Sequence, residues 1–294
     1  MGKLIRCITS EGAIMVSAVD STDIVAKAEQ IHKTSAVTTA ALGRMLTAGA
    51  MMGNMLKGEN NSISLKIDGG GPSGAIVVSA DYHGNVRGYV QNPVVEIPLK
   101  PNGKLDVSAA VGQNGSLFVT KDLGLKEPYN AYVPIVSGEI AEDITSYYAI
   151  SEQIPTVCAL GVLVDTDLTV KKAGGYILQL LPFTEEEIIV KLEENLKKVR
   201  PLTALMDEGM DIEDIVRDVL QGFDVEVIYT EDVAYKCKCS REKVLKTLQS
   251  LGKDELEGMM NDLPEVNVSC HFCNTIYNFS KDDIEKILKN KKNF

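Results

Sequence analysis

Tryptophan is absent from this 294-residue sequence, and aromatic residues of any kind make up only 5% of it. A core with so few large rings has to be filled by aliphatic side chains and methionine. Hydrophobic residues nevertheless reach 45% and charged residues 24%, which is the composition of an ordinary globular protein. A chain of this length buries enough surface to fold without disulfides, and it corresponds to about two domains.

Long hydrophobic runs and an excess of basic residues are also missing. No stretch approaches the roughly 18 consecutive apolar residues of a membrane span, and the cationic start, Met1–Cys7, is not followed by the apolar run of a signal peptide. Asp and Glu outnumber Lys and Arg by 41 to 30, for a formal net charge of −11. An acidic chain repels nucleic-acid phosphate and anionic lipid. We therefore predict a cytoplasmic protein with no membrane partner and no nucleic-acid partner.

A nucleotide-binding loop is not supported either. The run Gly69–Gly74 reads Gly-Gly-Gly-Pro-Ser-Gly and formally matches the G-x-G-x-x-G pattern, but a dinucleotide site needs a helix directly after the loop. Pro72 interrupts this loop and the strand-like run 75–79 follows it, so a tight turn is the better interpretation. The sequence contains no G-K-[ST] motif, which argues against ATP as a ligand.

Short strand-like runs and helical stretches fill the first 182 residues. Apolar residues at helical spacing predict a helix from about Asp23 and another over 35–56, whose methionines we expect to pack in the core. Strand-like runs separated by turns occur at residues 3–9, 13–18, 63–67, 75–79, 86–90, 116–120, 131–134, 157–164 and 175–181. This order predicts an α+β N-terminal domain over residues 1–182, with a large, mainly antiparallel sheet and helices.

The character of the sequence changes after this domain. Thr184 and Glu187 predict a capping box at the start of the first of two helices. Residues 206–232 contain ten acidic residues and one basic residue, a formal charge of −9. We interpret residues 183–232 as an acidic helical linker and not as a compact domain of its own.

Residues 233–294 are expected to form a small C-terminal domain. Ser240 predicts the start of one helix, and Ser280 with Asp283 predicts a capping box at the start of another. Between these helices two short strands are expected, 266–270 and 275–277. A domain of this size has a thin core, so a bound metal ion would stabilise it.

Four of the six cysteines form two close pairs, Cys237-Lys238-Cys239 and Cys270-His271-Phe272-Cys273, separated by thirty residues. Clustered cysteines in a reducing compartment indicate metal or redox chemistry more than structural disulfides. Four thiolates suit tetrahedral Zn²⁺, and its binding would contribute folding free energy to the small domain. We predict one Zn²⁺ ion bound by Cys237, Cys239, Cys270 and Cys273.

The same spacing makes the site oxidisable. Each close pair can close on itself as a disulfide once zinc leaves, and such short loops gain little from cross-linking, so these bonds should be readily reduced again. Metal-bound thiolates are deprotonated and therefore open to oxidation. Oxidation would release zinc and remove what keeps the small domain folded.

Three other interpretations of the cysteine pattern are weaker. A zinc deaminase would carry an H-x-E motif ahead of P-C-x-x-C, and four thiolates leave no open position for catalysis. A thiol–disulfide oxidoreductase would place C-x-x-C at a helix N-terminus, not between two strands. We therefore expect no enzyme. The remaining alternative is a zinc-stabilised module that binds nucleic acid or protein without redox switching, although the net acidity argues against nucleic acid.

Cys7, Cys158 and His271 have simpler interpretations. Neither Cys7 nor Cys158 has a partner nearby in the sequence, and both are expected to be small buried hydrophobic residues. His271 lies inside the C-x-x-C turn and could replace a thiolate ligand. Because four sulfurs already complete a tetrahedral site, we expect it to be a bystander.

The full set of motifs resembles one known family. The C-x-C pair, about thirty residues, and the C-x-x-C pair near the C-terminus are similar to the pattern of the redox-regulated holdases of the 33 kDa heat-shock chaperone family. The resemblance covers the whole chain, since four stretches of the N-terminal region are similar as well, at residues 69–74, 84–89, 147–155 and 173–176.

This resemblance implies an ATP-independent holdase that binds unfolding proteins and prevents their aggregation during oxidative and heat stress. It implies that the reduced, zinc-bound protein is inactive. Oxidation then joins Cys237 to Cys239 and Cys270 to Cys273 and releases zinc. The zinc domain and the linker unfold, which exposes the surface that binds clients, and the activated form is a homodimer.

Overall fold

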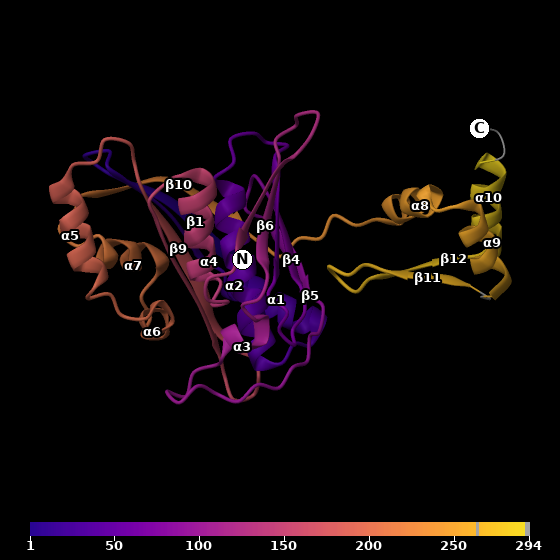
Figure 1. The fold of residues 1–294 in the computed structure, drawn as a ribbon, viewed down its shortest axis with the longest axis horizontal. Helices are drawn as coiled ribbons and strands as arrows, with labels where there is room; N and C mark the ends of the chain where they lie inside the picture. Colours follow the sequence, from indigo (N-terminus) through magenta and orange to yellow (C-terminus); the bar gives the residue numbers. More distant parts are fainter. Residues whose placement is uncertain (263–264, 292–294) are drawn as a thin grey trace. The chain divides into compact units, whose positions relative to one another are not determined.

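The computed structural model describes residues 1–262 and 265–291. The chain divides into two compact units, Met1–Lys236 and Cys237–Phe294 (Figure 1). The larger unit contains two five-stranded antiparallel sheets with helices between and outside them. The predicted α+β class with antiparallel strands is confirmed, with the difference that the strands form two sheets and not one.

The first sheet joins the two ends of the larger unit. Its strands, in spatial order, are β10 (Val225–Val233), β1 (Gly2–Thr9), β2 (Ile14–Asp20), β9 (Val170–Leu180) and β8 (Thr156–Val164). The hairpin predicted at the N-terminus forms β1 and β2. Strand β10 pairs antiparallel with β1 along its whole length, from Val225 opposite Thr9 to Val233 opposite Gly2. The last strand of this unit therefore closes the sheet at its N-terminal hairpin.

The second sheet is built from the middle of the chain. Its strands, in spatial order, are β5 (Val86–Val90), β4 (Ile76–Asp81), β3 (Ser62–Asp68), β6 (Ser116–Asp122) and β7 (Tyr129–Pro134). The glycine-rich run 69–74 connects β3 to β4, with Gly70 and Gly74 at φ of 73° and 63°. Because a strand follows this run and not a helix, the prediction of a tight turn is confirmed.

Helix α2 (Ala36–Asn54) is the central element of the core. Nearly all of its residues are buried, because it contacts strands of both sheets. Met45, Met51 and Met52 belong to the same buried cluster as side chains of β3, β4 and β6. The core role predicted for this methionine-rich helix is confirmed. Although α2 is long and buried, no helix within 1–262 or 265–291 is long and apolar enough to cross a bilayer.

Shorter helices complete the main core: α1 (Thr22–His32), α3 (Val107–Val111), α4 (Ala141–Tyr147) and the π-helix η1 (Tyr148–Glu152). The turn before α4 is held by the buried carboxylate of Asp143, which accepts hydrogen bonds from the backbone amides of Val136, Ser137 and Ile140 at 2.8, 3.1 and 2.9 Å. A buried carboxylate is stable there because several backbone donors share its charge.

Residues 183–233, called the covering segment below, contain α5 (Glu186–Leu196), α6 (Leu202–Asp207), α7 (Ile212–Val219) and β10. The three helices pack on the face of the first sheet opposite α2, and β10 is an edge strand of that sheet (Figure 1). Leu205 and Ile215 are buried against Val16 and Tyr176 of the sheet. Amphipathic helices need such a surface because their apolar faces are unstable in water.

The sequence predicts an acidic helical linker over residues 183–232, and the structure differs in two respects. The segment ends in a strand of the first sheet, and its helices belong to the same compact unit as residues 1–182. The predicted capping box is also wrong. Glu185 is the N-cap residue of α5, while the Thr184 hydroxyl donates to the carbonyl oxygens of Ala13 and Leu181 at 3.0 and 2.7 Å. A tertiary contact with the β1–β2 hairpin thus replaces the local cap.

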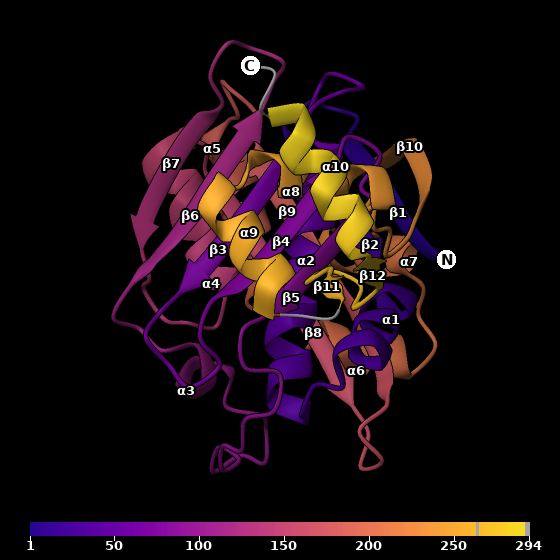
Figure 2. The ribbon, with the colours of Figure 1, turned by 90° about the vertical axis from the view of Figure 1, so that its right-hand side faces the viewer.

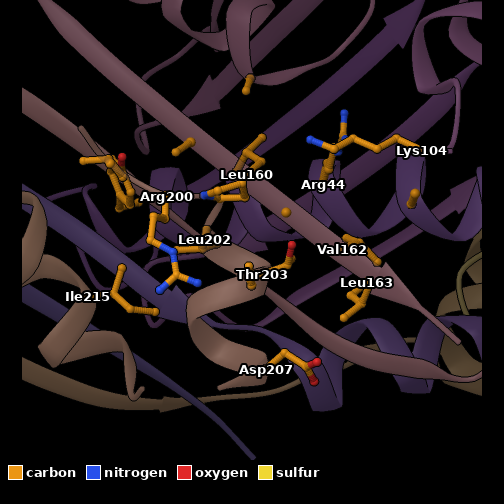
Figure 3. A pocket seen from close by; sticks show the side chains of 18 of the residues that line it. Arg44, Lys104, Leu160, Val162, Leu163, Arg200, Leu202, Thr203, Asp207 and Ile215 are labelled. Carbon is orange, nitrogen blue, oxygen red and sulfur yellow. The ribbon is translucent and has the colours of Figure 1, made fainter. Parts of the chain in front are cut away.

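A cavity of about 900 Å³ lies between part of the covering segment and the edge strand β8 (Figure 3). Leu160, Val162 and Leu163 of β8 line it, together with Leu202 and Thr203 of α6. Every residue of β8 is only partly buried. Side chains beside a cavity lack some of the dispersion contacts of a close-packed core. Helix α6 is therefore held less firmly than the helices of the main core.

The smaller unit consists of a two-stranded sheet and helices. Within the described residues its elements are α8 (Arg241–Ser250), α9 (Lys253–Asp262), β11 (Val266–Ser269), β12 (Ile276–Phe279) and α10 (Lys281–Lys291), and α9 and α10 lie side by side (Figure 2). The predicted caps are confirmed. Ser240 Oγ accepts from the amide of Lys243, and Ser280 and Asp283 exchange side-chain-to-backbone hydrogen bonds. The core of this unit is one small cluster centred on Leu256 and Phe279.

Gly161 of β8 allows α6 to approach the sheet. A Cβ atom at this position would lie 2.6 Å from Thr203 Cγ2, which is too close for two carbon atoms. We expect Gly161→Ala to destabilise the larger unit by about 1–3 kcal/mol, measured by urea denaturation. Thr203→Ser removes the clashing methyl group, so combining it with Gly161→Ala should restore most of the loss. A double variant as unstable as the single one would contradict this packing.

Candidate metal centre

Two separate segments of the smaller unit supply the four clustered cysteines. Cys237 and Cys239 directly precede α8, whose N-cap is Ser240. Cys270 and Cys273 lie in the turn between β11 and β12. The helices and the hairpin thus bring together two pairs of thiols that are thirty residues apart in the sequence.

The four sulfur atoms form a compact cluster. Every Sγ lies within 4.8 Å of every other. Across the two segments, the Sγ atoms of Cys237 and Cys270 are 3.7 Å apart and those of Cys239 and Cys273 are 3.3 Å apart. All four thiols are free and partly buried. Four sulfur atoms at these distances can bind a single metal ion, so the fold brings together all four residues that the sequence predicts as ligands.

Backbone hydrogen bonds shape the turn that carries the second pair. The amides of Cys273 and Asn274 donate to the carbonyl oxygen of Cys270 at 3.2 and 2.8 Å, and the amide of Cys270 donates to the carbonyl oxygen of Thr275 at 2.9 Å. Asn274 has φ of 54°, a region that asparagine enters more readily than most residues. The turn is therefore held by the backbone, which leaves both thiols available to a metal ion.

Two hydroxyl groups that the sequence analysis missed lie against the cluster. The Tyr277 hydroxyl donates to Cys239 Sγ at 3.1 Å, and Thr275 Oγ1 lies 3.2 Å from Cys273 Sγ. The alternation of an extended strand, which places residues two apart on one face, is the signal that could have found them. The hydrogen bond to Cys239 raises the pKa of Tyr277 to about 12, so this hydroxyl keeps its proton at neutral pH.

The surroundings also give the thiols different pKa values. Burial raises the pKa of Cys237 to about 12 and raises the pKa of Cys270 as well. Burial acts in the same direction on Cys273, but hydrogen bonds from the side chain and backbone of Thr275 outweigh it and lower its pKa to about 7. Because the thiolate is the form that binds a metal, the lowered pKa of Cys273 favours its ionised, metal-binding form.

Cys7, Cys158 and His271 are placed differently. Cys7 is fully buried on β1, and burial raises its pKa to about 11. Cys158 on β8 packs against the main core, and burial raises its pKa too. His271 is exposed in the turn, and the candidate ligand cluster found in the described part of the chain consists of cysteines alone.

Comparison with known proteins relates nearly the whole chain to one family. A family model described as Hsp33 protein matches residues 2–280. Two relatives named 33 kDa chaperonin are each 47% identical: one from Clostridium perfringens (strain SM101 / Type A) over 99% of this chain and 92% of its own length, and one from Lachnoclostridium phytofermentans over 97% of both chains. The crystal structure of a 33 kDa chaperonin (heat shock protein 33 homolog) from Thermotoga maritima is 38% identical, with a TM-score of 0.91 over 99% of both chains.

Replacing any clustered cysteine should weaken metal binding. We expect Cys239→Ser to reduce the affinity for Zn²⁺ by at least about tenfold and to lower the thermal stability of the smaller unit, because the ion contributes folding free energy through all four ligands. Competition with a chromogenic chelator measures the affinity. Cys158→Ala, on β8, is the matched control and should leave it unchanged. Wild-type zinc content and stability in Cys239→Ser would refute the ligand assignment.

Metal affinity should rise with pH. Because burial raises the pKa of Cys237 and Cys270, these thiols carry protons at neutral pH that a metal ion must displace. Lowering the pH from about 8 to about 6 is expected to weaken binding roughly tenfold per pH unit for each proton released. Proton release on adding Zn²⁺ to weakly buffered protein counts these protons. An affinity that does not change with pH would show that the thiols are already ionised.

Proposed function

The chain belongs to the Hsp33 family of chaperones, and on this premise we propose that it is a redox-regulated, ATP-independent holdase. It binds unfolding proteins and keeps them from aggregating during oxidative and heat stress. The observation that carries the proposal is the cluster of four sulfur atoms in a unit with a small core of its own. The reduced, zinc-bound form is inactive, and oxidation of the cysteines activates it.

Zn²⁺ is the ion that this ligand set fits best. Tetrahedral zinc at about 2.3 Å from each sulfur places neighbouring sulfurs about 3.8 Å apart, close to the distances of 3.7 and 3.3 Å across the cluster. Cys237, Cys239, Cys270 and Cys273 would hold the ion. When bound, zinc supplies a cross-link between the two cysteine segments and neutralises part of the thiolate charge. Four thiolates leave no open position for a substrate, in keeping with a protein that is not an enzyme.

Oxidation would convert each near pair into a disulfide, Cys237 with Cys239 and Cys270 with Cys273. Cysteines one or two residues apart stay close when the cluster opens, whereas the two segments are free to separate. The short loops gain little stability from their cross-links, which suits a bond that a thiol reductant must reverse. The smaller unit would then lose the cross-link between its two segments and unfold.

The chain directly before Cys237 is hydrogen-bonded to the second sheet, and through it unfolding of the smaller unit would spread to the larger unit. The amide of Lys236 donates to the carbonyl oxygen of Val86 at 2.9 Å. The Tyr235 hydroxyl donates to the carbonyl oxygen of Gly88 at 2.7 Å. Since Cys237 is the next residue along the chain, unfolding that starts there would loosen this attachment first and then β10, the last strand of the covering segment.

Release of the covering segment would expose an apolar surface for clients. The face of the first sheet beneath it carries Ile5, Val16, Tyr176 and Leu178, all buried in the resting protein. An apolar surface of this kind binds the apolar segments that unfolding proteins expose. The segment is suited to leave, because α6 borders a cavity and because the charge of −9 over residues 206–232 favours an extended chain in water.

The remaining parts of the proposal follow from the family. Clients would be unfolded or partly folded proteins, and the activated form would be a homodimer in the cytoplasm. We expect no ATP, nucleic acid or membrane among its partners. The alternative is a zinc-stabilised module that binds nucleic acid or protein and does not respond to oxidants.

Zinc release and suppression of aggregation should develop together during peroxide treatment at elevated temperature. A colorimetric chelator follows the metal, and light scattering follows the aggregation of a heat-labile test protein. We expect both changes to be reversed by a thiol reductant and to need no ATP. The Cys158→Ala variant keeps the four clustered cysteines and should respond like the wild type. If zinc leaves and aggregation is unaffected, the metal site only stabilises the fold, and a zinc-stabilised binding module without redox switching is favoured.

A further inference from the structure

We infer that the hydroxyl groups of Thr275 and Tyr277 are positioning groups of the thiol switch, which make Cys273 and Cys239 less nucleophilic and so slow the oxidation that releases the metal ion. The inference rests on the proposed function, because it concerns the reactivity of the same four sulfurs.

The geometry places both hydroxyl groups on one edge of the sulfur cluster. Tyr277 lies in β12 and Thr275 directly before this strand, two residues away, so their side chains share a face. The Tyr277 hydroxyl is 3.1 Å from Cys239 Sγ, and Thr275 Oγ1 is 3.2 Å from Cys273 Sγ. These two sulfurs are themselves only 3.3 Å apart. Strand β12 and the residue two positions before Tyr277 therefore place one hydroxyl group beside one sulfur of each cysteine segment.

The direction of the contact at Thr275 follows from the charge state of the sulfur. A thiolate has no proton to give, so the hydroxyl has to be the donor whenever Cys273 is ionised. Hydrogen bonds to an ionised acceptor are stronger than those between neutral groups. Both hydroxyl groups would thus bind their sulfurs most strongly in the metal-bound state, in which the sulfurs are thiolates.

Each near pair contains one sulfur with such a hydroxyl and one without. Cys239 has Tyr277 and Cys273 has Thr275, whereas Cys237 accepts from the backbone amide of Cys239, and Cys270 from those of Phe272 and Cys273. Each hydrogen bond withdraws electron density from its sulfur and lowers the nucleophilicity of that sulfur. The two side-chain hydroxyl groups are the donors that a substitution can remove without changing the backbone.

Oxidation of a pair takes two steps. One thiolate attacks a peroxide oxygen: an S–O bond forms, the O–O bond breaks, and hydroxide leaves. The other thiolate then attacks the resulting sulfenic acid: the S–S bond forms, the S–O bond breaks, and a second hydroxide leaves. Two thiolates together give two electrons to one peroxide. A hydroxyl group that donates to a thiolate slows the first step at that sulfur.

Tyr277 also connects the cluster to the hydrophobic core. Its ring packs against the small cluster that contains Leu256 and Phe279, while its hydroxyl reaches the sulfur. Tyr277→Phe keeps the ring and removes only the donor. Thr275 is exposed, so Thr275→Val removes the other donor at little risk to folding.

The test uses the zinc-bound, full-length protein and two matched controls. Tyr229→Phe removes a hydroxyl that donates to Glu231, and Thr247→Val removes one that donates to the carbonyl oxygen of Lys243 within α8. The rate of zinc release by peroxide is followed with a chelator, and sulfenic acids are trapped with dimedone and located by mass spectrometry. We expect release to be roughly threefold to tenfold faster in Tyr277→Phe and Thr275→Val, with both controls like the wild type.

The position of the dimedone label is the readout that a merely structural role would not move. Relative to the wild type, Tyr277→Phe should increase the label at Cys239, and Thr275→Val should increase it at Cys273. In cobalt-loaded protein, the sulfur-to-metal charge-transfer band should move to lower energy in both variants, because a sulfur without its hydrogen bond gives up electrons more easily.

The outcomes separate this inference from the proposed function. Unchanged release rates, label positions and cobalt spectra in both variants overturn the inference, while a wild type that still loses zinc and suppresses aggregation leaves the function standing. A wild type that keeps its zinc under peroxide contradicts the function, and the cobalt spectra then decide the hydrogen bonds alone. If Tyr277→Phe does not fold, Thr275→Val decides the outcome.

Discussion

The smaller unit depends on four sulfur atoms being held within 4.8 Å of one another. Its hydrophobic core is one cluster around Leu256 and Phe279, and a core of such a small unit contributes only about 3–5 kcal/mol. The sulfurs bring the residues before α8 next to the turn of the β11–β12 hairpin, two segments that lie at the edge of this core. Thiolates are oxidisable, so in the proposed function oxidation acts on the same atoms that hold this unit together.

The larger unit divides its stability differently. Helix α2 and the facing sides of both sheets form a core that needs no metal. The opposite side of the first sheet is buried only because the covering segment lies on it. Where that second layer meets the edge strand β8 of the sheet, the short helix α6 borders a cavity of about 900 Å³. One unit therefore combines a main core with an apolar sheet face that a single segment covers, which is the arrangement that the proposed holdase requires.

Most helices and strands could be predicted from local sequence pattern. The predictions that fail do so because contacts between distant parts of the chain decide the structure there. The sequence pattern predicts an acidic linker at β10, because Glu226 and Asp232 add to the charge of its surroundings. In the sheet the residues of this strand alternate between more and less buried positions, and Glu226 and Asp232 are exposed. Charge on an edge strand discourages further pairing. The partner that makes these residues a strand is β1, more than two hundred residues away in the sequence.

The sequence by itself determined the four candidate ligands, because Cys237, Cys239, Cys270 and Cys273 are recognisable by type and spacing. It also determined their chemistry, because clustered thiolates can bind zinc and can be oxidised. Only the tertiary structure decided which sulfurs have a hydroxyl beside them and which face of the first sheet is covered. Both depend on contacts between residues far apart in the chain, such as Tyr277 with Cys239, and local periodicity carries no record of such contacts.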